Sequence, residues 1–222
     1  MPTTRNLGKI KLLELFKGTG SQSKAAVQLG IKPENIISVD IDDKWKPTIK
    51  ADILNLEYKD LPVPDIITAS PPCETFSLLI ATHKNKVRDY KGDMKPLNRK
   101  GEIGDLVLFK TIEIIKYFLD KNPNLKFVIE NPRGFMVRMK CMNQEPIRYL
   151  CEAWYSCYGY TYRKPTHFWS NIPLKLNKGK EIEEQVGTKS KNTEMLSFNL
   201  KQRYSMPPEL CKSIISQLLS FK

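Results

Sequence analysis

The chain has 222 residues, enough to fill one hydrophobic core and too few for two ordinary domains, so we expect a single domain over residues 1–222. Lys and Arg outnumber Asp and Glu by 36 to 24, and the net charge of +12 favours a polyanionic partner such as a nucleic acid. No apolar stretch approaches the roughly 20 residues that a bilayer span requires, which argues against a membrane protein.

The cysteines indicate a reducing environment. There are five of them, and their spacing matches neither a metal site nor a disulfide framework. We therefore expect free thiols, no bound metal and a cytosol-like compartment.

Strand-like and helix-like segments alternate along the first two thirds of the chain. The pattern predicts, in chain order, a strand over 11–16, a helix over 21–29, strands over 36–39 and 65–69, a helix over 104–121 and a strand over 126–129. Near one face of the second helix we expect Leu106, Phe109, Ile112, Phe118 and Leu119. This alternation predicts an α/β fold, a mostly parallel sheet with helices on both faces, in which ligands collect at the carboxyl ends of the strands.

Two polar segments interrupt the alternation. Residues 74–101 are too long for an ordinary loop in a compact domain. Their basic residues are Lys84, Lys86, Arg88, Lys91, Lys95, Arg99 and Lys100. We interpret this segment as a basic loop that closes over a nucleic acid with its side chains on phosphates. Residues 171–201, rich in Lys and Glu, are read as a short polar insertion or a solvated surface.

A glycine-containing turn follows the first predicted strand and leads into a helix. Gly18 and Gly20 allow the backbone to turn tightly and approach a ligand, and Asp40, after the second strand, is placed to accept hydrogen bonds from ribose hydroxyls. Asp52 is placed to meet an adenine amino group. A dinucleotide fingerprint would require a third glycine where the chain has Ser23, so the turn favours a nucleoside cofactor other than a nicotinamide or flavin.

The third strand is followed by Ser70, two prolines and Cys73. Paired prolines fix φ and hold the chain extended, so the thiol projects rigidly from the end of the strand. An isolated cysteine is usually a buried structural residue, but this position next to the cofactor turn favours a nucleophile.

Glu130 comes directly after the predicted strand over 126–129 and precedes Asn131 and a proline. Glu-Asn-Pro alone is usually a turn. Together with Cys73, a carboxyl group here provides what attack on a pyrimidine requires, a nucleophile for C6 and a group that stabilises charge developing at N3.

The glycine turn, the acidic residue after the second strand, Pro-Pro-Cys and Glu-Asn-Pro, in this order, resemble the DNA cytosine-C5 methyltransferase family over roughly residues 9–140. The resemblance implies a Rossmann-like methyltransferase fold, S-adenosylmethionine as cofactor and DNA as partner, with a cytosine flipped out of the duplex. It also implies covalent catalysis, in which Cys73 adds to C6 of the base while Glu130 engages N3 and N4.

The motifs of the family transfer residue by residue. Those matching the cofactor site are Phe16, Gly18, Thr19, Gly20, Ser21, Asp40, Ile41, Asp52, Ile53, Ser70 and Pro71. Those expected at the substrate are Pro72, Asn131 and Lys164. The family's Arg-containing motif, which steadies the cysteine and the base, corresponds to residues 160–169, where Arg163 is the expected contact and Lys164 the next choice. Residues 203–208 resemble the last family motif, which returns to the cofactor pocket.

The chain departs from the family late in its sequence. Most members insert a sizeable target-recognition domain, but only about thirty residues separate Trp169 from Arg203, too few for a core of their own. The chain therefore resembles the small forms carried by phages and large viruses. Its expected location is the cytoplasm, or the nucleus or a viral factory for a eukaryotic or viral source.

Two alternatives stay open at this stage. One is a nucleic-acid-binding scaffold that no longer catalyses, although the intact Cys73 and Glu130 argue against it. The other is the same thiol chemistry on RNA or on a free pyrimidine nucleotide, since net charge does not distinguish DNA from RNA.

Overall fold

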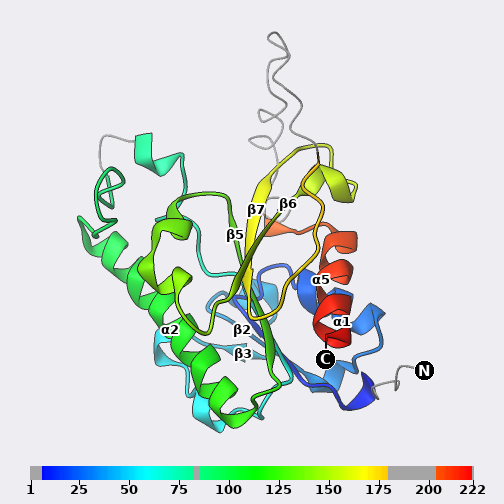
Figure 1. The fold of residues 1–222 in the computed structure, drawn as a ribbon. Coiled ribbons are helices and arrows are strands. Elements are labelled where there is room, and N and C mark those ends of the chain that lie inside the picture. Colours follow the sequence, from blue (N-terminus) through cyan, green and yellow to red (C-terminus); the bar gives the residue numbers. More distant parts are fainter. Residues whose placement is uncertain (1–6, 83–85, 180–203, 222) are drawn as a thin grey trace.

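The computed structural model describes residues 7–82, 86–179 and 204–221, and it contains a seven-stranded sheet with helices on both faces (Figure 1). The strands are β1 (Leu12–Leu15), β2 (Ile36–Asp40), β3 (Ile49–Lys50), β4 (Ile66–Ala69), β5 (Lys126–Pro132), β6 (Tyr149–Trp154) and β7 (Pro165–Ser170). Their order is β3-β2-β1-β4-β5-β7-β6. Strand β7 pairs antiparallel with both of its neighbours, β5 and β6, and all other pairings are parallel. The predicted mostly parallel α/β fold is confirmed.

In the described part of the chain, three α-helices cover the sheet: α1 (Ser21–Gln28), α2 (Arg99–Lys121) and α5 (Pro208–Ser220). Helices α1 and α5 pack together on one face and α2 lies on the other (Figure 1). Helix α1 ends where predicted, because Gly30 has a φ of 101° and the N–H of Ile31 reaches back to the carbonyl of Ala26 at 3.0 Å. None of the described helices has the length and apolar character needed to cross a membrane.

Helix α2 differs from its prediction in two respects. It begins at Arg99, five residues earlier than expected, because the Asn98 side chain accepts the N–H of Gly101 at 3.1 Å and caps the first turn. Two residues expected on the buried face, Leu106 and Phe109, are 45% and 48% exposed. The helix buries Gly101, Leu108, Thr111, Ile112, Ile114, Ile115 and Phe118.

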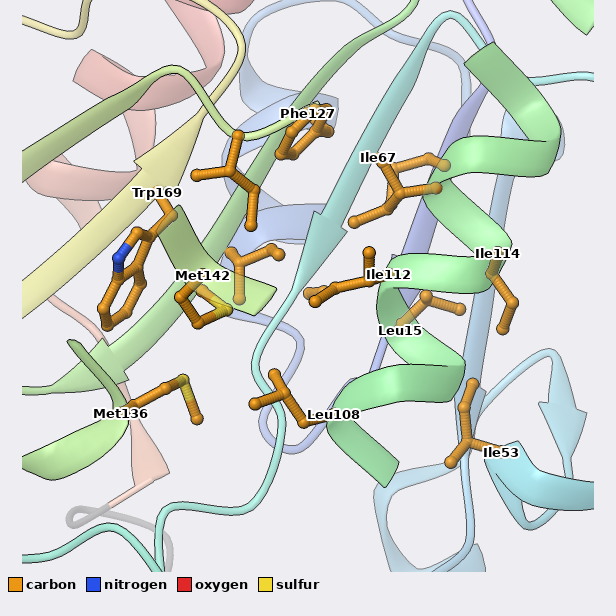
Figure 2. Packing of buried hydrophobic residues seen from close by; sticks show 14 of the residues in the cluster. Leu15, Ile53, Ile67, Leu108, Ile112, Ile114, Phe127, Met136, Met142 and Trp169 are labelled. Carbon is orange, nitrogen blue, oxygen red and sulfur yellow. The ribbon is translucent and has the colours of Figure 1, made fainter. Parts of the chain in front are cut away.

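The core between α2 and the sheet holds the carboxyl ends of the strands in place. Leu15 and Ile67 from the central strands pack against Leu108 and Ile112 of α2, and Trp169 of β7 extends the same cluster (Figure 2). Several of these side chains are completely buried, each contributing about 1.5–3 kcal/mol of hydrophobic stabilisation. The loops that leave these strands therefore start from rigid positions.

The two polar segments are more ordered than predicted where the structure describes them. Within 74–101, Arg88 is completely buried and cannot contact a phosphate, which corrects the reading of this residue as part of an open basic surface. Lys95 and Lys100 are exposed but paired with Asp93 and Glu74. Lys84 and residues 180–201 lie outside the described residues. The described part of the second segment, 171–179, packs on the sheet, where Asn171 bonds the backbone of residues 125 and 127.

Candidate active site

The candidate site residues gather at the carboxyl ends of the parallel strands β1, β2, β4 and β5. The glycine turn leaves β1, Asp40 closes β2, the Cys73 loop leaves β4 and Glu130 lies near the end of β5. Because parallel strands end on the same side of the sheet, residues far apart in the sequence come together, as the alternating pattern predicts.

The glycine turn is shaped for a ligand. Phe16, Gly18 and Gly20 have φ values of 60°, 49° and 68°, so the chain turns sharply between β1 and α1. A Cβ built on Gly18 would meet nothing closer than the Phe16 carbonyl at 4.0 Å, which leaves space for a ligand to approach the backbone. The C-terminal segment closes this turn, since the N–H of Met206 bonds Ser21 Oγ at 3.2 Å and Ser21 Oγ lies 2.9 Å from Thr19 Oγ1.

Asp40 supplies the acceptor expected at the end of β2. Its Oδ2 accepts the N–H of Gly18 at 2.8 Å and its Oδ1 the N–H of Asp42 at 2.9 Å, so the carboxylate is fixed beside the glycine turn. Each oxygen retains lone-pair capacity for a further donor, such as a ribose hydroxyl. Next to it, the Ile41 side chain is 65% exposed and offers an apolar surface. Rigid carboxylate, apolar side chain and open turn together fit a nucleoside.

Of the two adjacent residues Asp52 and Ile53, both expected at the cofactor site, only Asp52 presents its side chain. Asp52 uses one carboxylate oxygen to cap residues 53–55, bonding the N–H of Leu54 at 3.0 Å, and remains partly exposed. Ile53 is packed into the hydrophobic core against α2 (Figure 2), so only its backbone is available to a ligand.

The loop that carries Cys73 is anchored on its amino-terminal side. The N–H of Ser70 continues the sheet by bonding the Leu15 carbonyl at 3.2 Å, and Pro71 is buried. Asn131, 1% exposed, donates from Nδ2 to the Pro71 carbonyl at 2.8 Å. Asn131 thus fixes the loop that carries Cys73, which favours a positioning role over the predicted contact with the base. Pro72 is exposed.

Burial is the main cause of the shifted pKa values of Cys73 and Glu130. Burial raises the pKa of the Cys73 thiol, the nearby Glu130 raises it further, and Lys164 lowers it. Burial also raises the pKa of Glu130, against the opposing effects of Lys164 and of a hydrogen bond from Ser70. A raised pKa favours the protonated carboxyl, the form that can donate a hydrogen bond to a ring nitrogen.

The structure brings Lys164 to this site and directs Arg163 away from it. The Arg163 side chain is exposed and its guanidinium stacks over the Trp154 ring, 4.3 Å from the centroid. Lys164 interacts electrostatically with both Glu130 and Cys73, and burial lowers the pKa of its ammonium group. Its Nζ lies 4.7 Å from the centroid of Tyr155, a completely buried ring that sequence reasoning missed because it lies within a run of aromatic residues.

Comparison with known proteins identifies the family of the chain. The profile of the C-5 cytosine-specific DNA methylase family matches residues 10–158. A Frog virus 3 protein named "Probable DNA (cytosine-5)-methyltransferase" is 34% identical over 168 residues, which cover 73% of this chain and 71% of that protein. An orphan methyltransferase of Bacillus phage SPR is 25% identical over 141 residues, 59% of this chain and 28% of the phage protein.

Among solved structures, the Dnmt2 methyltransferase of S. pombe aligns with 75% of this chain and 53% of its own, at 17% identity and a TM-score of 0.48. The chain therefore spans most of the frog virus protein but about half of the Dnmt2 structure. From the match of the family profile and the frog virus relative, this chain belongs to the C-5 cytosine-specific DNA methylase family.

Proposed function

We propose that the chain transfers a methyl group from S-adenosylmethionine to C5 of cytosine in DNA, with Cys73 as the nucleophile. The observation that carries the proposal is the cluster of Cys73, Glu130 and Lys164 at the carboxyl ends of the strands, in which Glu130 and Lys164 both act on the pKa of the Cys73 thiol. Membership of the family supports the methyl-transfer reaction. The glycine turn, which leaves space for a ligand at Gly18, supports a nucleoside cofactor.

In this proposal the Cys73 sulfur forms a bond to C6 of the cytosine ring. The thiolate is the attacking species, so the proton of the thiol must leave first. Lys164 stabilises the thiolate as an adjacent cation, in the place where the family has an arginine. When a base has removed the proton from C5, the S–C6 bond breaks and Cys73 leaves as the thiolate, which restores the aromatic ring.

Glu130 provides the complementary group. Addition of sulfur to C6 moves negative charge toward N3, and a protonated Glu130 can donate a hydrogen bond there. The raised pKa of Glu130, caused by burial, supports this assignment. The hydrogen bond from Ser70 holds the carboxyl group in place.

The residues proposed to hold the cofactor are the glycine turn, Asp40 at the ribose, Ile41 and Asp52 at the adenine. Bound S-adenosylmethionine would supply the methyl group that is added at C5. The cytosine must leave the base stack to reach Cys73, so a flipped nucleotide in duplex DNA is the proposed substrate.

The test is a trapping experiment with duplex DNA that contains 5-fluorocytosine, incubated with S-adenosylmethionine. Fluorine cannot be removed from C5 as a proton is, so the Cys73 adduct persists and survives denaturation. Wild type should form the adduct and Cys73→Ser should not. Cys157→Ser, which changes another partly exposed thiol, is the matched control and should behave as wild type.

Absence of an adduct on duplex DNA, in a protein that binds the cofactor, would refute the proposed substrate. Single-stranded DNA, transfer RNA and deoxycytidine monophosphate are included as competitors. If one of them abolishes methylation of the duplex at equal concentration, the substrate class changes while the Cys73 chemistry stands.

A further inference from the structure

Arg88 is a fully buried cation that bonds the loop following the proposed nucleophile, Cys73. Its side chain is 0% exposed, and its guanidinium forms an ion pair with Asp105 of α2, with 2.6 Å between Nη1 and Oδ1. The guanidinium also lies 4.4 Å from the centroid of the Phe76 ring. A charge in such a place requires partners for all of its donors.

Arg88 donates four hydrogen bonds in addition to its ion pair with Asp105. Nε donates to the Thr75 carbonyl at 3.0 Å, and Nη2 donates to Thr75 Oγ1 at 3.2 Å and to the Gly101 carbonyl at 3.0 Å. Nη1 donates to the Met94 carbonyl at 3.2 Å and faces Asp105. Two of these bonds end on Thr75, two residues after Cys73. A lysine, whose three donors share one nitrogen, could not form all of these hydrogen bonds.

Other contacts hold the same side of the loop. Tyr90 Oη donates to the Thr75 carbonyl at 3.1 Å, and the N–H of Phe76 bonds the Cys73 carbonyl at 2.9 Å. The fit is close, because a Cβ on Gly104 would lie 2.4 Å from Thr75 Oγ1 and one on Gly134 would lie 2.4 Å from the Phe76 carbonyl. The segment after the nucleophile is therefore seated against α2 and the end of β5.

Cys73 is thus held between two anchors. Asn131 bonds the carbonyl of Pro71, two residues before it, and Arg88 with Tyr90 bonds Thr75, two residues after it. We propose that Arg88 is a positioning residue for catalysis, which sets the place of the Cys73 sulfur through Thr75. The inference rests on the proposed function, in which that sulfur attacks the base.

The alternative is that Arg88 only stabilises the fold. Burying an ion pair usually gains little free energy relative to well-packed apolar residues, so stability alone explains poorly why a fully buried arginine stands here. A network of four hydrogen bonds and one ion pair does fix the geometry of the loop to which it is bonded. Geometry matters for the reaction, because a misplacement of about 1 Å at the reacting atom costs about 100-fold in rate.

Three variants test the proposal. Arg88→Lys keeps the charge but loses the fork of donors, and Tyr90→Phe removes only the hydroxyl that bonds Thr75. The control is Arg138→Ala, because the hydrogen bonds of Arg138 go to the backbone carbonyls of Tyr90 and Gly92 in the same segment. The first two variants remove bonds to Thr75 itself, and the control removes only bonds to the backbone of the segment.

The readouts are the rate of the fluorocytosine adduct at saturating DNA and cofactor, the concentrations giving half-saturation, and the melting temperature. Arg88→Lys should lower the saturated rate by about 100-fold, and Tyr90→Phe by about fivefold, as expected for one hydrogen bond. The half-saturating concentrations should not change. Arg138→Ala should lower the melting temperature without changing the saturated rate. Equal losses of rate in Arg88→Lys and Arg138→Ala, or a wild-type rate in folded Arg88→Lys, would overturn the proposal.

A second measurement separates this inference from the proposed function. Alkylation of Cys73 by iodoacetamide is followed by mass spectrometry without DNA, with Cys157 of the same protein as internal reference. Arg88→Lys should change the rate at Cys73 relative to Cys157, and Arg138→Ala should not. If wild type forms no DNA adduct, the proposed function fails. An unchanged alkylation ratio in Arg88→Lys overturns the positioning role, whatever the result with DNA.

Discussion

The buried carboxyl group of Glu14 should make the protein less stable as the pH rises. Glu14 lies in the middle of β1, is 4% exposed and accepts a hydrogen bond from Ser23 of α1. Burial raises its pKa from 4.5 to about 7, although the bond from Ser23 and the charge of Lys17 oppose the shift. Cys211 of α5 also faces this carboxyl group.

The size of the effect follows from the two pKa values. Glu14 is protonated more readily in the folded chain than in the unfolded chain, so stability falls as the pH rises from about 4.5 to about 7. At about 1.4 kcal/mol per pKa unit, the cost of ionising this group in the folded protein reaches about 3 kcal/mol above pH 7. Glu14→Gln stays neutral and should escape the cost, since the amide oxygen can still accept from Ser23.

The assay is urea unfolding of wild type and Glu14→Gln at pH 5 and at pH 8. The variant should be more stable than wild type by about 3 kcal/mol at pH 8 and by less than about 1 kcal/mol at pH 5. Comparing the two proteins cancels the contributions of all other titrating groups. A difference that is the same at both pH values would refute the reasoning, because it would show that Glu14 has no raised pKa in the folded state.

The remaining predictions concern the site and its support. Lys164→Ala should slow adduct formation, and Arg163→Ala should leave its rate unchanged; equal effects of the two alanine variants would contradict the assignment. Lys164→Arg should move the pH profile of the rate to lower pH, because a permanent cation lowers the pKa of the thiol. Asp40→Ala should weaken S-adenosylmethionine binding by about tenfold or more in calorimetry, the loss expected for hydrogen bonds to a charged acceptor. Gly104→Ala should lower the free energy of unfolding by about 1–3 kcal/mol, since its Cβ would lie 2.4 Å from Thr75 Oγ1; at an uncrowded helix position the same change would stabilise.

The fold was predictable where the sequence has a strong local signal. Buried parallel strands such as β1 and β4 are continuous apolar runs bounded by turns, and helix α1 ends at a glycine. Strand β3 has only two residues and was missed, as was the edge strand β6, whose first residues are exposed. The faces of α2 were misread because Leu106 and Phe109 remain half exposed, and hydrophobicity alone does not show which apolar residues are covered.

The site was predictable to the level of motifs and less so for individual side chains. Cys73, Glu130 and Asp40 lie at strand ends, where the alternating pattern already places functional groups. The sequence prediction placed Arg163 ahead of Lys164, because residue type does not show which of two adjacent residues in an extended segment points toward the site. Arg88 was misread as a surface charge because nothing in the sequence marks the acceptors, on Thr75, Met94, Gly101 and Asp105, that allow it to be buried.

Burial acts on the three groups of the proposed site in the same sense, because it favours the neutral form of each. It raises the pKa of Cys73 and of Glu130 and lowers the pKa of Lys164. Forming the thiolate in such an environment requires a compensating positive charge, and Lys164 supplies one that lowers the pKa of Cys73. A protonated Glu130 then remains available as a donor to N3, and it no longer competes with the thiolate for Lys164. The same burial that makes each charge costly when isolated therefore couples the three proton positions, so that the pH dependence of attack belongs to the cluster as a whole and not to Cys73 alone.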